Sequence, residues 1–138
     1  MSYDLMVFAK EHAPRGRQAF LAWYGEQSEW EEDHSYSDPV VATPELRAWF
    51  LEIVSLYPAM NGPFAPAEWP DDDSRVTDYS IGRQVIYAAF AWSVAEAAYQ
   101  DMFRLAAKHG VGFFNASSEG AEVWLPNDNG GLTLSQQP

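Results

Sequence analysis

Carboxylates gather in two short stretches of this sequence, and each stretch also carries large aromatic side chains. The first is Glu29-Trp-Glu-Glu-Asp-His-Ser-Tyr-Ser-Asp38, and the second is Glu68-Trp-Pro-Asp-Asp-Asp73. Carboxylates at this density can bind a metal ion, transfer protons or attract a basic partner, and they also occur simply as solvated surface. The spacing of the residues helps to choose among these chemistries.

The spacing argues against a metal site in either stretch. Calcium loops place their ligands at alternate positions with a glycine at the sixth, whereas Asp71, Asp72 and Asp73 are contiguous and the sixth residue is Val76. The helical zinc pattern needs two histidines four residues apart, and His34 has no such neighbour. The chain has no cysteine, which excludes thiolate ligands and disulfides. We therefore expect no bound metal and no cofactor.

Catalytic signatures are also missing. The sequence has no G-x-S-x-G elbow, no phosphate-binding P-loop, no G-x-G-x-x-G and no cysteine nucleophile. Pairs of carboxylates can hydrolyse glycosides, but among 20 acidic residues some pair always lies close by chance. Arg83, beside Gly82, could hold an anion, although an arginine in a hairpin turn is more often solvated. We expect no catalytic residue and a protein that is not an enzyme.

The overall composition bounds the class of protein. A chain of 138 residues with 47% hydrophobic content fits one folded domain. Its net charge of −12 repels nucleic acid and anionic lipid, and it attracts basic proteins. The first residues do not resemble a signal peptide, and no segment approaches the roughly 18 apolar residues of a membrane span. We expect a cytoplasmic protein that binds neither nucleic acid nor membrane.

Hydrophobic periodicity predicts the elements that must position these carboxylates. The clearest is a helix that Thr43 caps and Pro44 begins, with an apolar stripe from Leu46 to Tyr57. Another helix is expected from a Ser93–Glu96 capping box to Gly110. The remaining predicted elements are a helix over 14–27 and strands over 3–9, 76–81, 84–91, 111–115 and 122–125. Residues 1–126 are predicted to form one domain, and 127–138 a flexible polar tail.

The predicted order β-α-α-β-β-α-β-β indicates an α+β fold. A compact solution is an antiparallel-rich sheet with the helices packed on one face. Its β-α-β-β-α-β part has the ferredoxin-like order, to which one helix and one terminal strand are added.

The two acidic stretches then fall in irregular segments. The second lies in a loop over 59–73 that contains three prolines, and structureless loops of this length are often functional. Solvated surface remains the ordinary interpretation of both stretches. The sharper one is a partner-binding surface, because aromatic side chains ringed by acids suit a cationic partner. Its candidate residues are Trp30, Glu31, Glu32, Asp33, Tyr36, Phe64, Trp69, Asp71, Asp72 and Asp73.

Four further segments carry a resemblance to known proteins. SYDLMVF at 2–8, TPELRAW at 43–49, RQVIYAAFAWS at 83–93 and LAAKHGVGFFN at 105–115 are similar to segments of small uncharacterised bacterial proteins. Some of those proteins are immunity-like and are encoded near secreted toxins. The resemblance covers most of residues 3–125 and implies a shared fold, but it transfers no functional residue, and it does not extend to the loop over 59–73.

Charge, aromatic-rich acidic segments and this resemblance favour a non-enzymatic immunity protein that occludes the active site of a basic toxin. The alternative is a small-molecule-binding or enzymatic α+β domain with a pocket between sheet and helices. A nucleic-acid mimic, with carboxylates in place of phosphates, is a third hypothesis that the high aromatic content disfavours.

Overall fold

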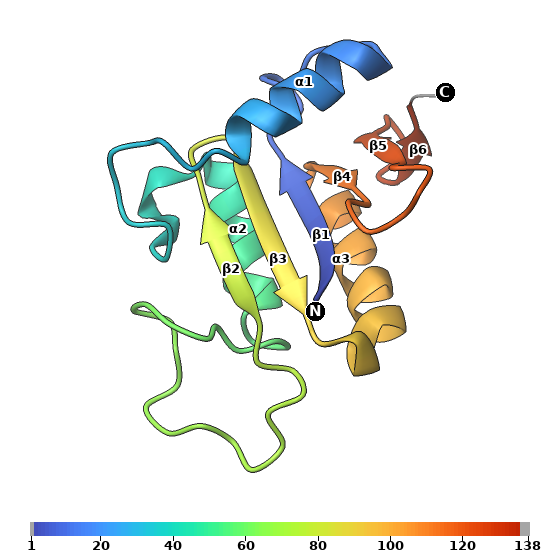
Figure 1. Ribbon diagram of the computed structural model, residues 1–138. Helices are drawn as coiled ribbons and strands as arrows, with labels where there is room; N and C mark the ends of the chain where they lie inside the picture. Colours follow the sequence, from blue (N-terminus) through green and yellow to red (C-terminus); the bar gives the residue numbers. More distant parts are fainter. Residues whose placement is uncertain (1, 136–138) are drawn as a thin grey trace.

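Six strands form one open antiparallel sheet, and three α-helices cover it (Figure 1). The computed structural model describes residues 2–135. The strands are β1 (Tyr3–Phe8), β2 (Asp78–Ile81), β3 (Val85–Phe90), β4 (Gly112–Phe114), β5 (Val123–Pro126) and β6 (Leu132–Leu134). The α-helices are α1 (Arg17–Gln27), α2 (Pro44–Ile53) and α3 (Ala95–His109), and the 3-10 turns are η1 (Pro39–Val41) and η2 (Trp92–Val94). The predicted α+β class is confirmed.

The order of the strands is β2-β3-β1-β4-β5-β6, and every neighbouring pair is antiparallel. Strand β1, at the N-terminus, is therefore an inner strand, which suits its apolar sequence. The hairpin of β2 and β3 closes where Gly82 donates its N–H to the carbonyl of Val85, at 2.8 Å. Helices α1 and α2 separate β1 from β2 along the chain, and β3 lies between these two strands in the sheet.

The helices do not all lie on one face of the sheet, which corrects the sequence-based expectation. Leu5 and Val7 of β1 face a core shared with α2 and α3. The alternate residues Met6 and Phe8 face a second core to which α1 contributes Phe20 and Trp23. The physical reason is that successive strand residues point to opposite faces, so a strand that is apolar on both faces needs a cover on each. Helix α1 supplies the second cover (Figure 1).

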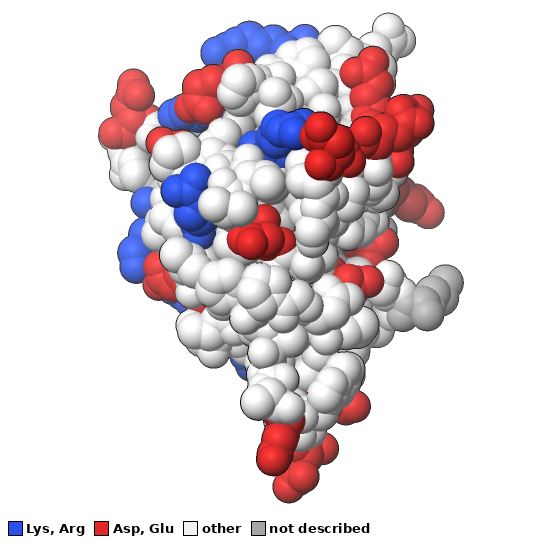
Figure 2. Space-filling view, turned by 90° about the vertical axis from the view of Figure 1, so that its left-hand side faces the viewer, with Lys and Arg blue, Asp and Glu red and all other residues white. Residues whose placement is uncertain are grey.

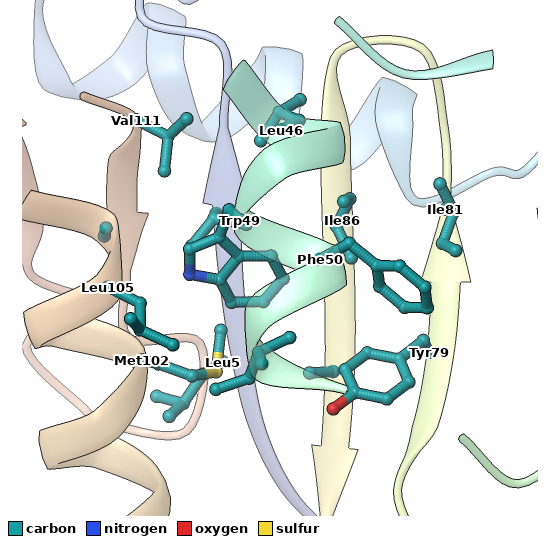
Figure 3. Packing of buried hydrophobic residues seen from close by; sticks show 14 of the residues in the cluster. Leu5, Leu46, Trp49, Phe50, Tyr79, Ile81, Ile86, Met102, Leu105 and Val111 are labelled. Carbon is teal, nitrogen blue, oxygen red and sulfur yellow. The ribbon is translucent and has the colours of Figure 1, made fainter. Parts of the chain in front are cut away.

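The larger core lies between the sheet and helix α2. Thr43 caps α2, because its side-chain oxygen accepts the Leu46 N–H at 3.4 Å, as the sequence predicted. The apolar stripe is also confirmed, since Trp49 and Phe50 are fully buried against the strands (Figure 3). Phe50 meets the ring of Tyr79 edge-on, at 5.1 Å between centroids, which links α2 to strand β2.

Two predictions about element ends are wrong and one is confirmed. Ser93 does not cap α3, since η2 intervenes and the helix begins at Ala95 without a side-chain cap. The predicted tail contains strand β6, whose residues pair with β5, although 136–138 lie outside the described residues. Gly110 ends α3 in the left-handed conformation, as predicted. Within residues 2–135, no helix is both long enough and apolar enough to cross a bilayer.

Candidate functional site

The loop that carries the second acidic stretch is closed at its base by backbone hydrogen bonds. Met60 donates its N–H to the Thr77 carbonyl at 2.9 Å, and Thr77 donates to the Pro58 carbonyl at 2.8 Å. These bonds accompany a bridge between Ala59 and Thr77, so the two ends of the chain segment lie side by side. We call the intervening residues 60–76 the acidic loop.

Tyr57 supports this closed base from below. Its backbone carbonyl accepts the Tyr79 hydroxyl at 2.7 Å, and the Arg75 guanidinium lies 4.7 Å above its ring. Its own hydroxyl donates to Asp101 at 2.7 Å. Burial, followed by the hydrogen bond to Asp101, raises the pKa of Tyr57 to about 12, so this hydroxyl remains a donor at neutral pH. The acidic loop therefore stands on a fixed base.

The outer part of the acidic loop is exposed. Trp69 is 55% exposed, the highest value among the tryptophans of residues 2–135, and Phe64 is 39% exposed with its ring 5.5 Å from that of Phe50. Asp71, Asp72 and Asp73 are all exposed, and no cationic side chain of residues 2–135 lies within ion-pair distance of them. Acidic side chains mark the lower end of the molecule in Figure 2, where this loop lies.

A local hydrogen bond shapes the acidic loop at Asp72. Its carboxylate accepts the Ser74 N–H at 3.0 Å, and contacts with Ser74 hold the pKa of Asp72 below its usual range. Asp72 is therefore ionised at neutral pH. Arg75 contributes a minor favourable charge interaction, but no cationic side chain of residues 2–135 lies within ion-pair distance of Asp72.

The first acidic stretch is arranged differently, because two of its carboxylates, Glu32 and Asp33, are paired within the molecule. Glu32 accepts hydrogen bonds from the Arg83 backbone N–H at 3.1 Å and from the ring of His34. Asp33 pairs with the Arg83 guanidinium at 2.7 Å while staying largely exposed. Tyr36 accepts the Glu32 N–H at 2.6 Å. Arg83, which the sequence suggested was solvated, thus joins the β2-β3 turn to residues 32–34.

These pairings shift two pKa values in opposite directions. The Arg83 guanidinium lowers the pKa of Asp33, chiefly through the side-chain hydrogen bond. The Ser35 carbonyl, followed by the Glu32 carboxylate, raises the pKa of His34. Both shifts favour the charged forms, so this cluster is held together by charge-assisted hydrogen bonds.

Trp30 is not the exposed anchor that its acidic neighbours suggested. It is half-buried, with ring centroids 5.3 Å from Tyr36 and 6.2 Å from Tyr87. It packs against the core beneath α1 and adopts a positive φ of 53°, a backbone conformation in which the chain turns toward the sheet. Trp30 and Tyr36 therefore serve the packing of this segment.

The acidic loop touches the first acidic stretch at Ser37, near the β2 edge of the sheet. Gly62 of the acidic loop has a φ of 86°, and a Cβ atom there would lie 2.5 Å from Cβ of Ser37. The Tyr36 carbonyl accepts the Ile81 N–H at 2.8 Å, which fixes the first segment to the same edge. The carboxylates of the two stretches nevertheless lie toward opposite ends of β2, because Asp33 pairs with Arg83 in the turn after this strand and the acidic loop precedes it. Glu32, Trp30 and Tyr36 are only partly exposed.

Residues 2–135 contain no group of three or more acidic or histidine side chains arranged to hold a metal ion. The sequence did not indicate the contacts of the first stretch with distant residues, above all Arg83. No local pattern joins positions 32 and 83.

Comparison with protein-family models, with curated proteins and with solved structures finds no match to this chain.

Proposed function

We propose that this chain is a non-enzymatic protein-binding protein, an immunity protein that neutralises a basic toxin by covering the toxin's active site. One observation supports this function above others. The acidic loop presents the exposed Trp69 between Glu68 and Asp71–Asp73, and no cation of residues 2–135 pairs with these acids. A large aromatic side chain surrounded by unpaired charges of one sign suits a partner of the opposite charge.

The geometry of the acidic loop favours binding in two ways. Its base is fixed by the bonds at Thr77 and Tyr57, so less conformational entropy is lost when the loop meets a partner. Its carboxylates contribute four of the 20 acidic residues of a chain with a net charge of −12, and this local charge steers a basic partner toward this end of the molecule.

The scaffold and the resemblance agree with a binding role. We regard β1-α2-β2-β3-α3-β4 as a ferredoxin-like unit to which α1, β5 and β6 are added. The acidic loop is an insertion between α2 and β2 of this unit, and variable surface loops on a rigid scaffold commonly carry recognition. We place the protein in the bacterial cytoplasm, where it would meet a toxin that acts on intracellular substrates.

The test is capture of the natural partner from the source cells, followed by a functional assay. The wild-type chain should retain a basic protein, and its co-expression should restore growth to cells that produce that protein. Trp69→Ala should lose both effects. Trp92→Ala is the matched control for loss of an exposed indole, because Trp92 is similarly exposed, at 53%, but lies outside the acidic loop and packs against the ring of Tyr3.

Two outcomes would overturn the proposed function. One is a captured partner that Trp69→Ala binds as tightly as the wild type does. The other is a partner whose activity is unchanged when the complex has formed.

A further inference from the structure

A cleft at the opposite end of the molecule from the acidic loop has the features of a small-molecule site. It has a volume of about 330 Å³ and lies where the start of α1 meets the end of β1 and strand β5 (upper right in Figure 1). This volume is at the lower end of the range of ligand pockets, about 300–1,000 Å³. The lining residues are Phe8, Lys10, Glu11, Ala13, Pro14, Arg15, Phe20, Val123, Leu125, Pro126 and Ser135.

The wall of this cleft is apolar. The apolar lining residues that keep exposed surface are Ala13, Pro14, Leu125 and Pro126, and the buried residues Phe8, Phe20 and Val123 complete the lining. Water in such a cleft finds few hydrogen-bond partners, so an apolar group that replaces the water gains free energy. The wall therefore favours a ligand with an apolar body.

The rim of the cleft carries positive charge in a protein that is otherwise strongly acidic. Lys10 and Arg15 are exposed on the rim and form no hydrogen bond or ion pair within residues 2–135. Residues 10–17 contain three of the eight Lys and Arg residues of the chain but only one of its 20 acids, Glu11. The rim is thus a local exception to the net charge of −12.

Arg17 holds the cleft in shape. Its guanidinium donates to the carbonyls of Gly120 and Ala121, at 2.6 and 3.2 Å, and so ties the start of α1 to the segment that leads into β5. Because these acceptors are neutral, no carboxylate cancels the charge of Arg17. Its position keeps both walls of the cleft together and adds to the positive potential around it.

From this combination, we propose that the cleft binds a small amphipathic monoanion, a carboxylate with an apolar chain or ring. The apolar body lies against Ala13, Pro14 and Leu125, and the carboxylate meets Lys10 and Arg15 at the rim. Arginine and lysine are the side chains that recognise carboxylates in proteins. This site is independent of the acidic loop, so it stands or falls apart from the proposed binding of a toxin.

The test uses three probes that share one apolar chain: octanoate, octanol and octylammonium. Amide chemical shifts of the folded protein are followed during titration with each probe. We expect saturable octanoate binding with a Kd of about 1 mM. The chemical-shift changes should be centred on residues 10–15 and 123–125. Octylammonium should bind about tenfold more weakly, because it meets Lys10 and Arg15 as a like charge. Octanol should fall between the two.

Matched variants separate the two parts of the site. Lys10→Met and Arg15→Met should each weaken octanoate binding about two- to fivefold, as expected for exposed ion pairs. Lys108→Met is the control, since Lys108 pairs with Glu52 away from the cleft. Ala13→Phe should fill the cleft and abolish binding, whereas Ala22→Phe, on the exposed side of α1, should not. Glu11→Gln should tighten octanoate binding, because it removes a repelling carboxylate.

Several results would overturn this inference. They are no saturable shift with millimolar octanoate, binding of octylammonium at least as tight as that of octanoate, or weaker octanoate binding in Glu11→Gln. Shifts centred instead on the shallow groove of Tyr99, Phe103 and Trp124 would also place the ligand elsewhere. Partner capture by Ala13→Phe should remain at the wild-type level whatever the titrations show, so the two proposals fail separately.

Discussion

The two acidic, aromatic stretches are alike in composition, but one makes contacts within the protein and the other is exposed to solvent. In residues 29–38, Glu32 and Asp33 pair with Arg83, and Trp30 packs between Tyr36 and Tyr87. In residues 68–73, every residue is exposed, and the carboxylates have no cationic partner within residues 2–135. The same residue types therefore make intramolecular contacts in residues 29–38 and form exposed surface in residues 68–73.

The difference lies in what the fold brings to each segment. The β2-β3 turn delivers Arg83 to the first stretch, and the sheet beneath α1 supplies aromatic rings for Trp30. The second stretch projects from a closed base beyond the end of the sheet, where nothing of the described chain covers it (Figure 1). The role of a run of acidic residues can therefore be assigned only when the residues distant in sequence that contact it are known.

The first prediction has the largest expected effect, and it compares the loss of stability caused by substitutions in the core with that caused by a substitution in the acidic loop. Phe50→Ala should destabilise the fold by about 3–5 kcal/mol, because it empties a fully buried site and removes the ring on which Phe64 and Tyr79 pack. Trp49→Ala should cost a similar amount. Trp69→Ala should change the free energy of unfolding by less than about 0.5 kcal/mol. Urea denaturation measures all three, and a stable Phe50→Ala would mean that α2 is not the core helix.

The sequence predicted those parts of the fold whose signals are local. Helix α2 follows from Thr43, Pro44 and an apolar stripe of helical period, and the end of α3 follows from Gly110. The face on which α1 lies was not predictable in this way, because an apolar stripe shows that a helix is covered but not by which side of a sheet. Strand β6 was missed because a strand of three residues, Leu132–Leu134, is too short to show a periodicity.

In the candidate site too, features with a local signal in the sequence were predictable and features that depend on distant residues were not. Exposure of Trp69 was predictable, since a proline-rich loop cannot continue a helix or a central strand. Burial of Trp30 and pairing of Glu32 were not, since they depend on Tyr87 and Arg83, which lie some fifty residues further along the chain. The cleft near Lys10 arises from three separate segments, and no short stretch of sequence indicates it.

The second prediction concerns the contact of Gly62, in the acidic loop, with Ser37 of the first stretch. Gly62→Ala should destabilise the protein by about 1–2 kcal/mol, because an alanine at positive φ is strained. Its Cβ would also collide with Ser37, so the acidic loop should move away from residues 35–37. Gly130→Ala is the control, with the same strain but open space around its Cβ. Equal destabilisation of both variants would show that the contact with Ser37 contributes nothing.

The third prediction contrasts equivalent carboxylates in the two stretches. Glu32→Ala should cost about 1–2 kcal/mol, because it leaves the Arg83 N–H and the His34 ring without their acceptor. Asp71→Ala should cost less than about 0.5 kcal/mol. Thermal or urea unfolding of the two variants at pH 7 provides the measurement. If both variants unfold alike, the pairings of Glu32 are without energetic consequence and the contrast between the stretches fails.

The fourth prediction is a dependence of stability on pH that comes from the first stretch. The folded-state pKa of His34 is raised by Ser35 and Glu32, so its contribution is complete below the unfolded value of about 6.5. The contribution is lost as the pH rises through the higher folded value. Unfolding measured at pH 6 and pH 8 should therefore show less stability at pH 8, and His34→Gln should reduce that difference. A difference that is unchanged in His34→Gln would assign it to other groups.

The last prediction tests the second stretch, where stability should hardly respond and binding should. Replacing Asp71, Asp72 and Asp73 with asparagine removes three charges that no described cation pairs with, so the free energy of unfolding should change by less than about 0.5 kcal/mol per site. Association with the captured partner should slow on the order of tenfold at low salt, and its salt dependence should flatten. Dissociation should change less, whereas Trp69→Ala should mainly accelerate dissociation.

The matched control for this triple variant changes the net charge by the same amount elsewhere. Glu26, Glu119 and Asp128 are exposed acids outside both stretches and form no ion pair within residues 2–135, so their amide variants isolate the effect of position. Because steering depends on where charge lies as well as on its sum, the control should slow association much less. Equal slowing by both triples would mean that only the total charge matters, and an unchanged rate in the Asp71–Asp73 variant would leave these carboxylates as solvated surface alone.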